Sequence, residues 1–251
     1  MSIDLNADLG EGFGAYHHDA DRELLDLVTS ANVACGFHAG DPLIMRDTVA
    51  IAAARGVAVG AHPGYPDLLG FGRRDLAATP AEITAYVIYQ VGALRAVCDA
   101  GGTRLRYVKA HGALYNRAVI DATAATAIVD AVRAVDPNLV LLALPGSRMV
   151  AAARAAGLAT ASEAFADRAY TPDGQLVSRS QPGAVIHDVR AVVERTVRMA
   201  TSGRVAAIDG TELEIEADSI CIHSDTPGAP ALLRAIREGL RAAGVALAPF
   251  A

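Results

Sequence analysis

Histidine and lysine, the residue types best suited to proton transfer near neutral pH, occur mainly at the ends of short apolar runs in this sequence. Four of the seven histidines follow short apolar runs, namely His38, His62, His111 and His223. The sole lysine, Lys109, precedes His111 by two positions, and 21 of the 22 basic residues are arginine. Histidine exchanges a proton near neutral pH, whereas lysine offers a compact ammonium group whose pKa responds to its surroundings. These five residues predict acid–base chemistry.

Carboxylates, amides and arginines follow the same apolar runs. A carboxylate can activate water, and an arginine can bind an anion. The candidates of this kind are Asn6, Asp8, Glu11, Asn32, Arg73, Arg74, Glu163, Arg168 and Asp225. We expect Asp8 to act in catalysis together with the four histidines and Lys109. We expect the others to bind substrate or phosphate.

Two of these residues have a predicted electrostatic relation. Lys109 and His111 alternate in strand register, so their side chains point to one face. Each should lower the pKa of the other, which suits proton transfer near neutrality. His38 lies in a segment that begins with Gly36 and ends with Gly40, so the backbone can turn sharply and present the imidazole. The alternative for His38 is a loop residue that bonds a nearby carbonyl.

Structural interpretations also exist for several arginines and carboxylates. Arg73 and Arg74 can form a surface basic pair, although the glycine-rich, aromatic stretch GYPDLLGFG before them favours anion binding. Glu163 can belong to a surface ion-pair group with Asp167 and Arg168.

The remaining histidines fall into two groups. His223 and Asp225 can form an oriented acid–base pair, or Asp225 can cap the last helix. The other three histidines, His17, His18 and His187, are expected to be solvated.

The elements that must position these residues alternate between strands and helices. Apolar runs predict strands at 2–9, 31–35, 57–62, 106–111, 138–144, 158–163 and 219–224. Helices are expected between them, one of them opened by a capping box from Thr79 to Glu82. A small hairpin is expected at 204–216, turning at Asp209 and Gly210.

Seven β/α pairs without a linker predict one α/β domain over residues 1–251. The expected architecture is a distorted β/α barrel, similar to a TIM barrel, of about seven parallel strands. An open doubly wound sheet is the alternative. In a barrel the carboxyl ends of the strands carry the chemistry, which is where the candidate residues lie.

Composition restricts the classes of partner. Net charge is −6 and no basic run exceeds two residues, which argues against nucleic acid. No apolar stretch is long enough to span a bilayer, and the first residues do not resemble a signal peptide, so a cytoplasmic protein is expected. The three cysteines are expected to be buried and reduced. The sequence contains no phosphate-binding loop. A homo-oligomer is compatible with the composition.

A divalent metal is allowed by the residue types. Asp8, His38, His62 and His111 could converge on one ion, although no local spacing requires it.

Six stretches in the same order resemble the LamB/YcsF family, whose members form the A subunit of bacterial 5-oxoprolinase. These stretches are DLNADLGEGFG, ANVACGFHAGDP, GAHPGYPDLLGFGRR, VKAHGALYN, EAFADRAY and ICIHSDTP. They run from residue 4 to residue 227, so the resemblance covers nearly the whole chain. It implies a seven-stranded barrel of the glycoside hydrolase/deacetylase type.

The resemblance also implies a function. The family opens the lactam of 5-oxoproline to L-glutamate, with ATP hydrolysed and with partner subunits B and C. A phosphorylated intermediate would need cations, for which Lys109, Arg73, Arg74 and Arg168 are candidates. Asp8 would activate water, assisted by His38 or His223. Without a phosphate-binding loop in this chain, ATP would be held largely by the partner subunits.

Two other functions fit the same residues. One is a metal-dependent deacetylase or amidohydrolase acting on a sugar or another acyl amide. The other is a non-catalytic subunit that holds the lactam while its partners carry out the reaction.

Overall fold

The fold is a closed parallel β-barrel, as predicted. The computed structural model describes residues 1–14, 20–223 and 228–251. The barrel strands are β1 (Ser2–Leu9), β2 (Ser30–Ala34), β3 (Ala58–His62), β4 (Leu105–Val108), β5 (Val140–Ala143), β6 (Thr160–Phe165) and β9 (Ser219–Ile222). Each pairs with the next in parallel, and β9 pairs with both β6 and β1. This last pairing closes the barrel and excludes the open doubly wound sheet.

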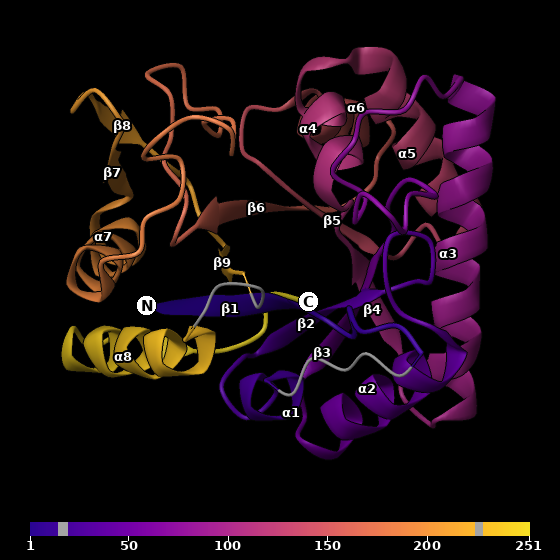
Figure 1. Cartoon of the computed structure of the whole chain (residues 1–251), viewed down its shortest axis with the longest axis horizontal. Helices are drawn as coiled ribbons and strands as arrows, with labels where there is room; N and C mark the ends of the chain where they lie inside the picture. The colour runs from indigo at the N-terminus through magenta and orange to yellow at the C-terminus, as the bar shows by residue number, and fades with distance from the viewer. Residues whose placement is uncertain (15–19, 224–227) are drawn as a thin grey trace.

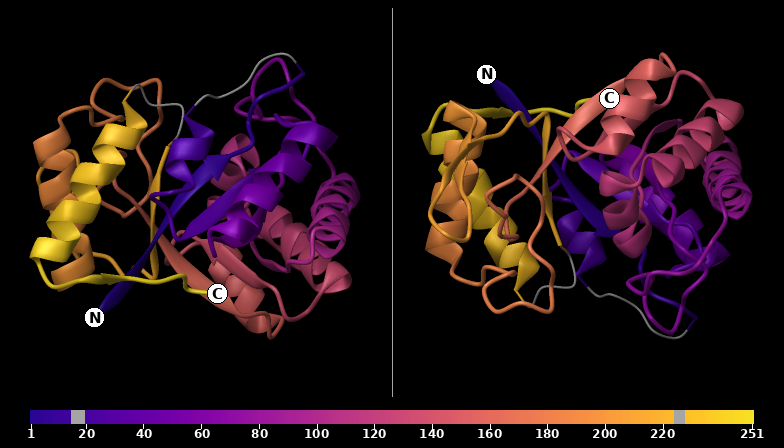
Figure 2. Two further views of the ribbon diagram at one scale, coloured as in Figure 1. Left: turned by 90° about the horizontal axis from the view of Figure 1, so that it is seen from below. Right: turned by 90° about the horizontal axis from the view of Figure 1, so that it is seen from above.

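Helices surround the barrel (Figures 1 and 2). They are α1 (Asp21–Leu24), α2 (Pro42–Ala54), α3 (Pro80–Ala100), α4 (Gly112–Ile120), α5 (Ala122–Val135), α6 (Arg148–Ala155), α7 (Val189–Ser202) and α8 (Ala229–Ala242). The pairs α3–α5 and α7–α8 pack at opposite sides of the barrel. Within the described ranges, no helix has the length and apolarity to cross a membrane.

Local sequence signals account for the start of two helices and for a hairpin. Asp41 caps α2 and accepts bonds from two backbone N–H groups, with Pro42 at the first helical position. Thr79 and Glu82 form the expected capping box of α3. The hairpin consists of β7 (Arg204–Ala206) and β8 (Glu212–Glu214), which are antiparallel.

Three elements differ from the prediction. The helix between the first two strands, α1, covers only Asp21–Leu24, although the whole connection was available to it. Helix α4 was not predicted, because it begins at a glycine and its N-cap residue, His111, makes no side-chain cap. Strand β10 (Ala246–Leu247) pairs with the start of β1 and is too short to give a periodic signal.

The inside of the barrel is polar, whereas the main apolar core lies between strands and helices. At the lower end, Asp4 accepts bonds from Ser30 and Ser219. Higher up, Asn32 donates to Asn6 at 2.7 Å and to Asp8 at 2.8 Å. These bonds hold the side chains of the first two strands in fixed positions that lead to the mouth of the barrel.

A small apolar cluster lies beside this polar column. Tyr107, Leu142 and Ala161 are buried there, and Phe250 packs against them. Tyr107 donates its phenolic hydrogen to Asn32 at 2.7 Å. The Asn32 amide, which donates to Asp8, is therefore itself fixed by the hydrogen bond from Tyr107.

Candidate active site

Lys109 is the centre of a buried ionic cluster at the carboxyl ends of the strands. Its Nζ lies 3.0 Å from Asp8 Oδ1 and 2.7 Å from Glu163 Oε1. Asn6 Oδ1 at 3.2 Å and Cys221 Sγ at 3.0 Å complete its surroundings. These contacts join β1, β6 and β9 to the residue after β4, so barrel closure brings them together.

The expected lowering of the Lys109 pKa is wrong. Burial alone would lower that pKa, but the carboxylates of Asp8 and Glu163 raise it well above the ordinary value. The prediction took His111 as the dominant neighbour and did not anticipate two carboxylates in contact. For His111 the expected direction is confirmed with another cause, because burial and then His38 and His62 lower its pKa.

Asp8 is held as a carboxylate by its neighbours. Its Oδ1 accepts a bond from Asn32 and lies 3.3 Å from His62 Nε2. Burial opposes the charged form, but His62 and Lys109 lower the pKa of Asp8 well below its usual range. Asp8 is therefore ionised at neutral pH.

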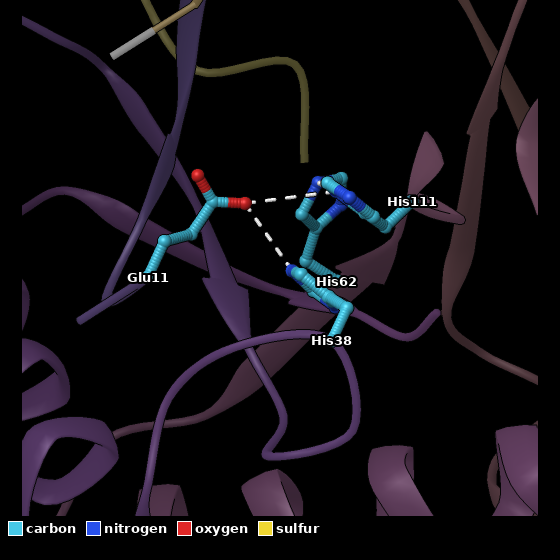
Figure 3. Close-up of side chains that lie close together, drawn as sticks. All are labelled: Glu11, His38, His62 and His111. Carbon is cyan, nitrogen blue, oxygen red and sulfur yellow. Dashed lines mark hydrogen bonds and ion pairs between the residues drawn. The ribbon is translucent and has the colours of Figure 1, made fainter. Parts of the chain in front are cut away.

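A second cluster consists of Glu11, His38, His62 and His111, all buried (Figure 3). The Glu11 carboxylate faces two of the rings, with Oε1 3.2 Å from His38 Nε2 and 3.6 Å from His111 Nδ1. The rings of His38 and His111 stack with centroids 3.7 Å apart. His62 Nε2 lies 2.9 Å from His111 Nδ1.

The predicted convergence of three histidines is therefore observed. One ligand atom from each of Glu11, His38, His62 and His111 lies within 4.8 Å of the others, so these four residues could hold a metal. Glu11 takes the place that the sequence assigned to Asp8. Asp8 belongs to a second such group with Cys221 and His223.

Backbone carbonyls orient two of these rings. His62 Nδ1 donates to the carbonyl of Lys109 at 2.8 Å, and His111 Nε2 donates to the carbonyl of Phe71 at 2.8 Å. The second carbonyl is placed by a turn in which Phe71 has φ 53° and Gly72 has φ 63°. The stretch expected to bind anions thus also positions a histidine.

Gly72→Ala is expected to destabilise the fold by about 1–3 kcal/mol more than Gly102→Ala. Both glycines have left-handed φ, but a Cβ at Gly72 would lie 2.7 Å from His38 Cβ and 2.8 Å from His111 Cδ2. At Gly102 a Cβ would meet nothing within 4 Å. Urea unfolding of both variants gives the difference, and equal losses would show that the histidines yield without cost.

His223 is paired with an acid that the sequence did not assign to it. Its Nδ1 lies 2.9 Å from Asp167 Oδ1, and its ring stacks on Phe165. Burial raises the pKa of Asp167, but His223 outweighs it, and the pKa is lowered. Asp225, the expected partner, lies outside the described residues, as do His17 and His18.

The interpretation of Glu163, Asp167 and Arg168 as a surface ion-pair group is wrong. Glu163 lies within β6, Asp167 and Arg168 follow its end at Phe165, and all three are buried. Arg168 donates to the carbonyls of Val177 and Ala184, and burial lowers its pKa to about 10. His187 is exposed, as expected.

A cavity of about 450 Å³ opens beside both clusters. The predicted residues that line it are Asp8, His62, Arg73, Lys109, His111, Arg168 and His223. The predicted residues that lie behind this lining, supporting it, are Asn6, Glu11, Asn32, His38 and Glu163. The cavity therefore joins the candidate acid–base groups to cationic side chains.

The arginines of the cavity differ from the prediction in two respects. Arg74 is bound to the buried carboxylate of Asp67, 2.9 Å from its Nε, and lies away from the lining. Arg179 lines the cavity although no sequence pattern indicated it. It belongs to the irregular segment after β6, where no periodic pattern predicts which way a side chain points.

Comparisons with known proteins agree with this geometry. The model of the LamB/YcsF family matches residues 3–251. A protein of Agrobacterium fabrum that is named as a 5-oxoprolinase A subunit is 55% identical over 250 residues, covering 100% of this chain and 98% of that protein. A crystal structure of a lactam utilization protein from Thermus thermophilus is 51% identical and covers all of both chains with a TM-score of 0.95.

A more distant likeness concerns the fold alone. A family 4 carbohydrate esterase from Streptomyces lividans, 12% identical, covers 100% of this chain and 93% of its own, with a TM-score of 0.50. The barrel is thus of the type found in deacetylases, as predicted.

Proposed function

Because the chain belongs to the LamB/YcsF family, we propose that it is the A subunit of an ATP-dependent 5-oxoprolinase, which opens the 5-oxoproline lactam to L-glutamate. The observation that carries this proposal is the cavity that places Lys109, Asp8 and His223 together. Its support from relatives is the 55% identity, over 250 residues, to a protein named for that activity.

The cavity suits a small anionic lactam. Arg73, Arg168 and Arg179 line it and can bind the substrate carboxylate or a phosphoryl group. Phe165 and Leu144 also line it and can contact the ring methylenes. The substrate therefore meets cations and apolar surface in one space.

The chemistry begins with a poor electrophile. Transfer of the terminal phosphoryl group of ATP to the lactam carbonyl oxygen would form an O–P bond, release ADP and activate the ring carbon. Water would then add to that carbon, and the ring C–N bond would break to leave an acyl phosphate. A second water would attack the acyl carbon and release phosphate. The overall change is lactam, ATP and two waters to glutamate, ADP and phosphate.

His223 is the residue best placed to take the proton from water. Its Nδ1 is committed to Asp167, so Nε2 is the nitrogen that remains for proton transfer. Asp8, as a carboxylate, can orient the water, and the Lys109 ammonium can stabilise charge on the carbonyl oxygen. His38 lies behind the lining, so we assign the assisting role to His223 rather than to His38.

Partner subunits B and C would supply much of the ATP site. A neighbouring open cavity of about 800 Å³ is lined by the carboxylates of Asp173, Glu214 and Glu216 with Arg204, a setting that disfavours a triphosphate. We therefore place the nucleotide on the partner subunits, with its phosphoryl end toward the arginines of this chain. We place the complex in the cytoplasm.

The test is glutamate release from 5-oxoproline by this chain alone and with subunits B and C, each with and without ATP. We expect release only when ATP and all three subunits are present. No release in any combination would refute the proposal.

The same assay separates two other functions. The fold of a carbohydrate esterase favours a deacetylase as the second candidate. Chelator-sensitive, ATP-independent release of acetate from an N-acetylated sugar would support it. If Lys109→Met retained both lactam binding and full turnover, the chain would instead be a non-catalytic binding subunit.

A further inference from the structure

The hydrogen bonds of two histidines determine where their hydrogens lie. A backbone carbonyl only accepts, so His62 must carry a hydrogen on Nδ1 to bond the carbonyl of Lys109. His111 must carry one on Nε2 to bond the carbonyl of Phe71. In the neutral rings, the other nitrogens, His62 Nε2 and His111 Nδ1, therefore present lone pairs.

Those two lone pairs meet. His62 Nε2 and His111 Nδ1 are 2.9 Å apart, a separation at which two unprotonated nitrogens repel. A positive centre beside them removes the repulsion, and the choices are a metal ion or a proton, which on His62 Nε2 would also face Asp8 Oδ1 at 3.3 Å. Both rings are buried, so a repulsive contact between them is not relieved by bulk solvent.

Two further ligand atoms, one from Glu11 and one from His38, lie within 4.8 Å of these nitrogens, which favours the metal. Glu11 Oε1 is 3.6 Å from His111 Nδ1 and 3.2 Å from His38 Nε2. Tetrahedral zinc with bonds of 2.0–2.1 Å places its ligand atoms about 3.4 Å apart. Three of the separations among these atoms, 2.9, 3.2 and 3.6 Å, bracket that value, and His38 must turn out of its parallel stack on His111 before both rings can direct a lone pair at one ion.

The hydrogen bonds around these side chains are those typical of metal ligands. Ligating histidines in proteins donate their second N–H to a carbonyl or carboxylate, as His62 and His111 do here. The four residues come from different loops and strands, so the fold itself assembles the site (Figure 3). By contrast, the group of Asp8, Cys221 and His223 already has a cation, because Lys109 Nζ lies 3.0 Å from both Asp8 Oδ1 and Cys221 Sγ.

We propose that Glu11, His38, His62 and His111 bind one divalent transition-metal ion, with Zn²⁺ or Co²⁺ strongly preferred over Mg²⁺. Three imidazoles and one carboxylate are the donors that zinc selects, whereas magnesium takes oxygen ligands. His62 and His111 also line the cavity, so the ion would lie at its wall. The proposal concerns binding and does not depend on which reaction the cavity performs.

The experiment is a titration of the chelator-treated protein with Co²⁺, followed by visible absorption, and then competition with Zn²⁺ and Mg²⁺. We expect one equivalent of Co²⁺ with the intense absorption of a four-coordinate ion, displaced by Zn²⁺ and unaffected by Mg²⁺. Glu11→Gln and His111→Asn are expected to weaken binding by at least about a hundredfold. The control is His187→Asn, at an exposed histidine, which should bind as the wild type does.

Several results would overturn the proposal. Far-UV circular dichroism establishes whether each variant is folded. If His111→Asn does not fold, the Co²⁺ affinity of the nearly isosteric Glu11→Gln variant decides the question. Equal Co²⁺ binding by Glu11→Gln and His187→Asn would place the ion elsewhere. A His62 ring that ¹⁵N NMR shows to be doubly protonated and unchanged by Zn²⁺ would assign the positive centre to a proton. None of these outcomes bears on glutamate release, which tests the reaction separately.

Discussion

Lys109→Met is expected to reduce ATP-dependent glutamate release by at least about a thousandfold. The change removes the ammonium group that contacts Asp8 at 3.0 Å and Glu163 at 2.7 Å while keeping a similar side-chain shape. It leaves two buried carboxylates without their shared cation, so the free energy of unfolding should also fall by about 3–5 kcal/mol. Lys109→Arg should not restore activity, because the cluster is closely packed around a compact ammonium group.

Turnover in the reconstituted complex and urea unfolding of the isolated chain measure the two effects. Arg148→Met is the matched control, because Arg148 is an exposed cation at the start of α6. A folded Lys109→Met protein with near-normal turnover would remove Lys109 from the reaction. A normal unfolding free energy would show that the cluster tolerates the loss of its cation.

Asp167→Asn is expected to lower kcat by about a hundredfold to ten-thousandfold with a small change in KM. Asp167 is a positioning residue that accepts the Nδ1 hydrogen of His223 and so leaves Nε2 unprotonated to accept a proton. An amide at this position can donate instead, which favours the opposite tautomer. His223→Gln should cost at least as much, because it removes the proton-accepting ring itself.

The pH profile distinguishes positioning from a merely structural role. The pKa of Asp167 is lowered in the fold, so its ion pair stabilises the protein above the carboxyl's unfolded-state pKa and is lost as pH falls through the folded value. Asp167→Asn should lose this acid-side dependence of stability and shift the acidic limb of the kcat profile. Asp130→Asn, an exposed control on α5, should change neither. An unchanged profile in Asp167→Asn would contradict the assigned role of His223.

The strands were predictable because each is a short apolar run that ends in glycine, proline or a polar residue. Barrel closure then places all their carboxyl ends at one mouth, which is why the candidate residues could be chosen without a structure. Helix α4 was not predictable in the same way, since a glycine start and the missing side-chain cap give no local signal.

Partners within the site depend on distances that the chain order does not reveal. His223 was paired in the sequence with Asp225, two positions away, but its bond is to Asp167, which lies 56 positions earlier. Lys109 meets Asp8 across 101 positions, so the direction of its pKa shift followed from tertiary packing. The same reason explains Arg179, which reaches the cavity from an irregular segment.

The measurement that tests the central claim most directly uses 5-oxoproline labelled with ¹⁸O in the lactam carbonyl. If the carbonyl oxygen accepts the phosphoryl group in this cavity, the complex should transfer the label to inorganic phosphate, in step with glutamate release. Loss of both label transfer and glutamate in Lys109→Met would place that step at this site. Glutamate that retains all the label, with none in phosphate, would contradict the proposed route, in which the lactam oxygen is phosphorylated and water then attacks the acyl carbon.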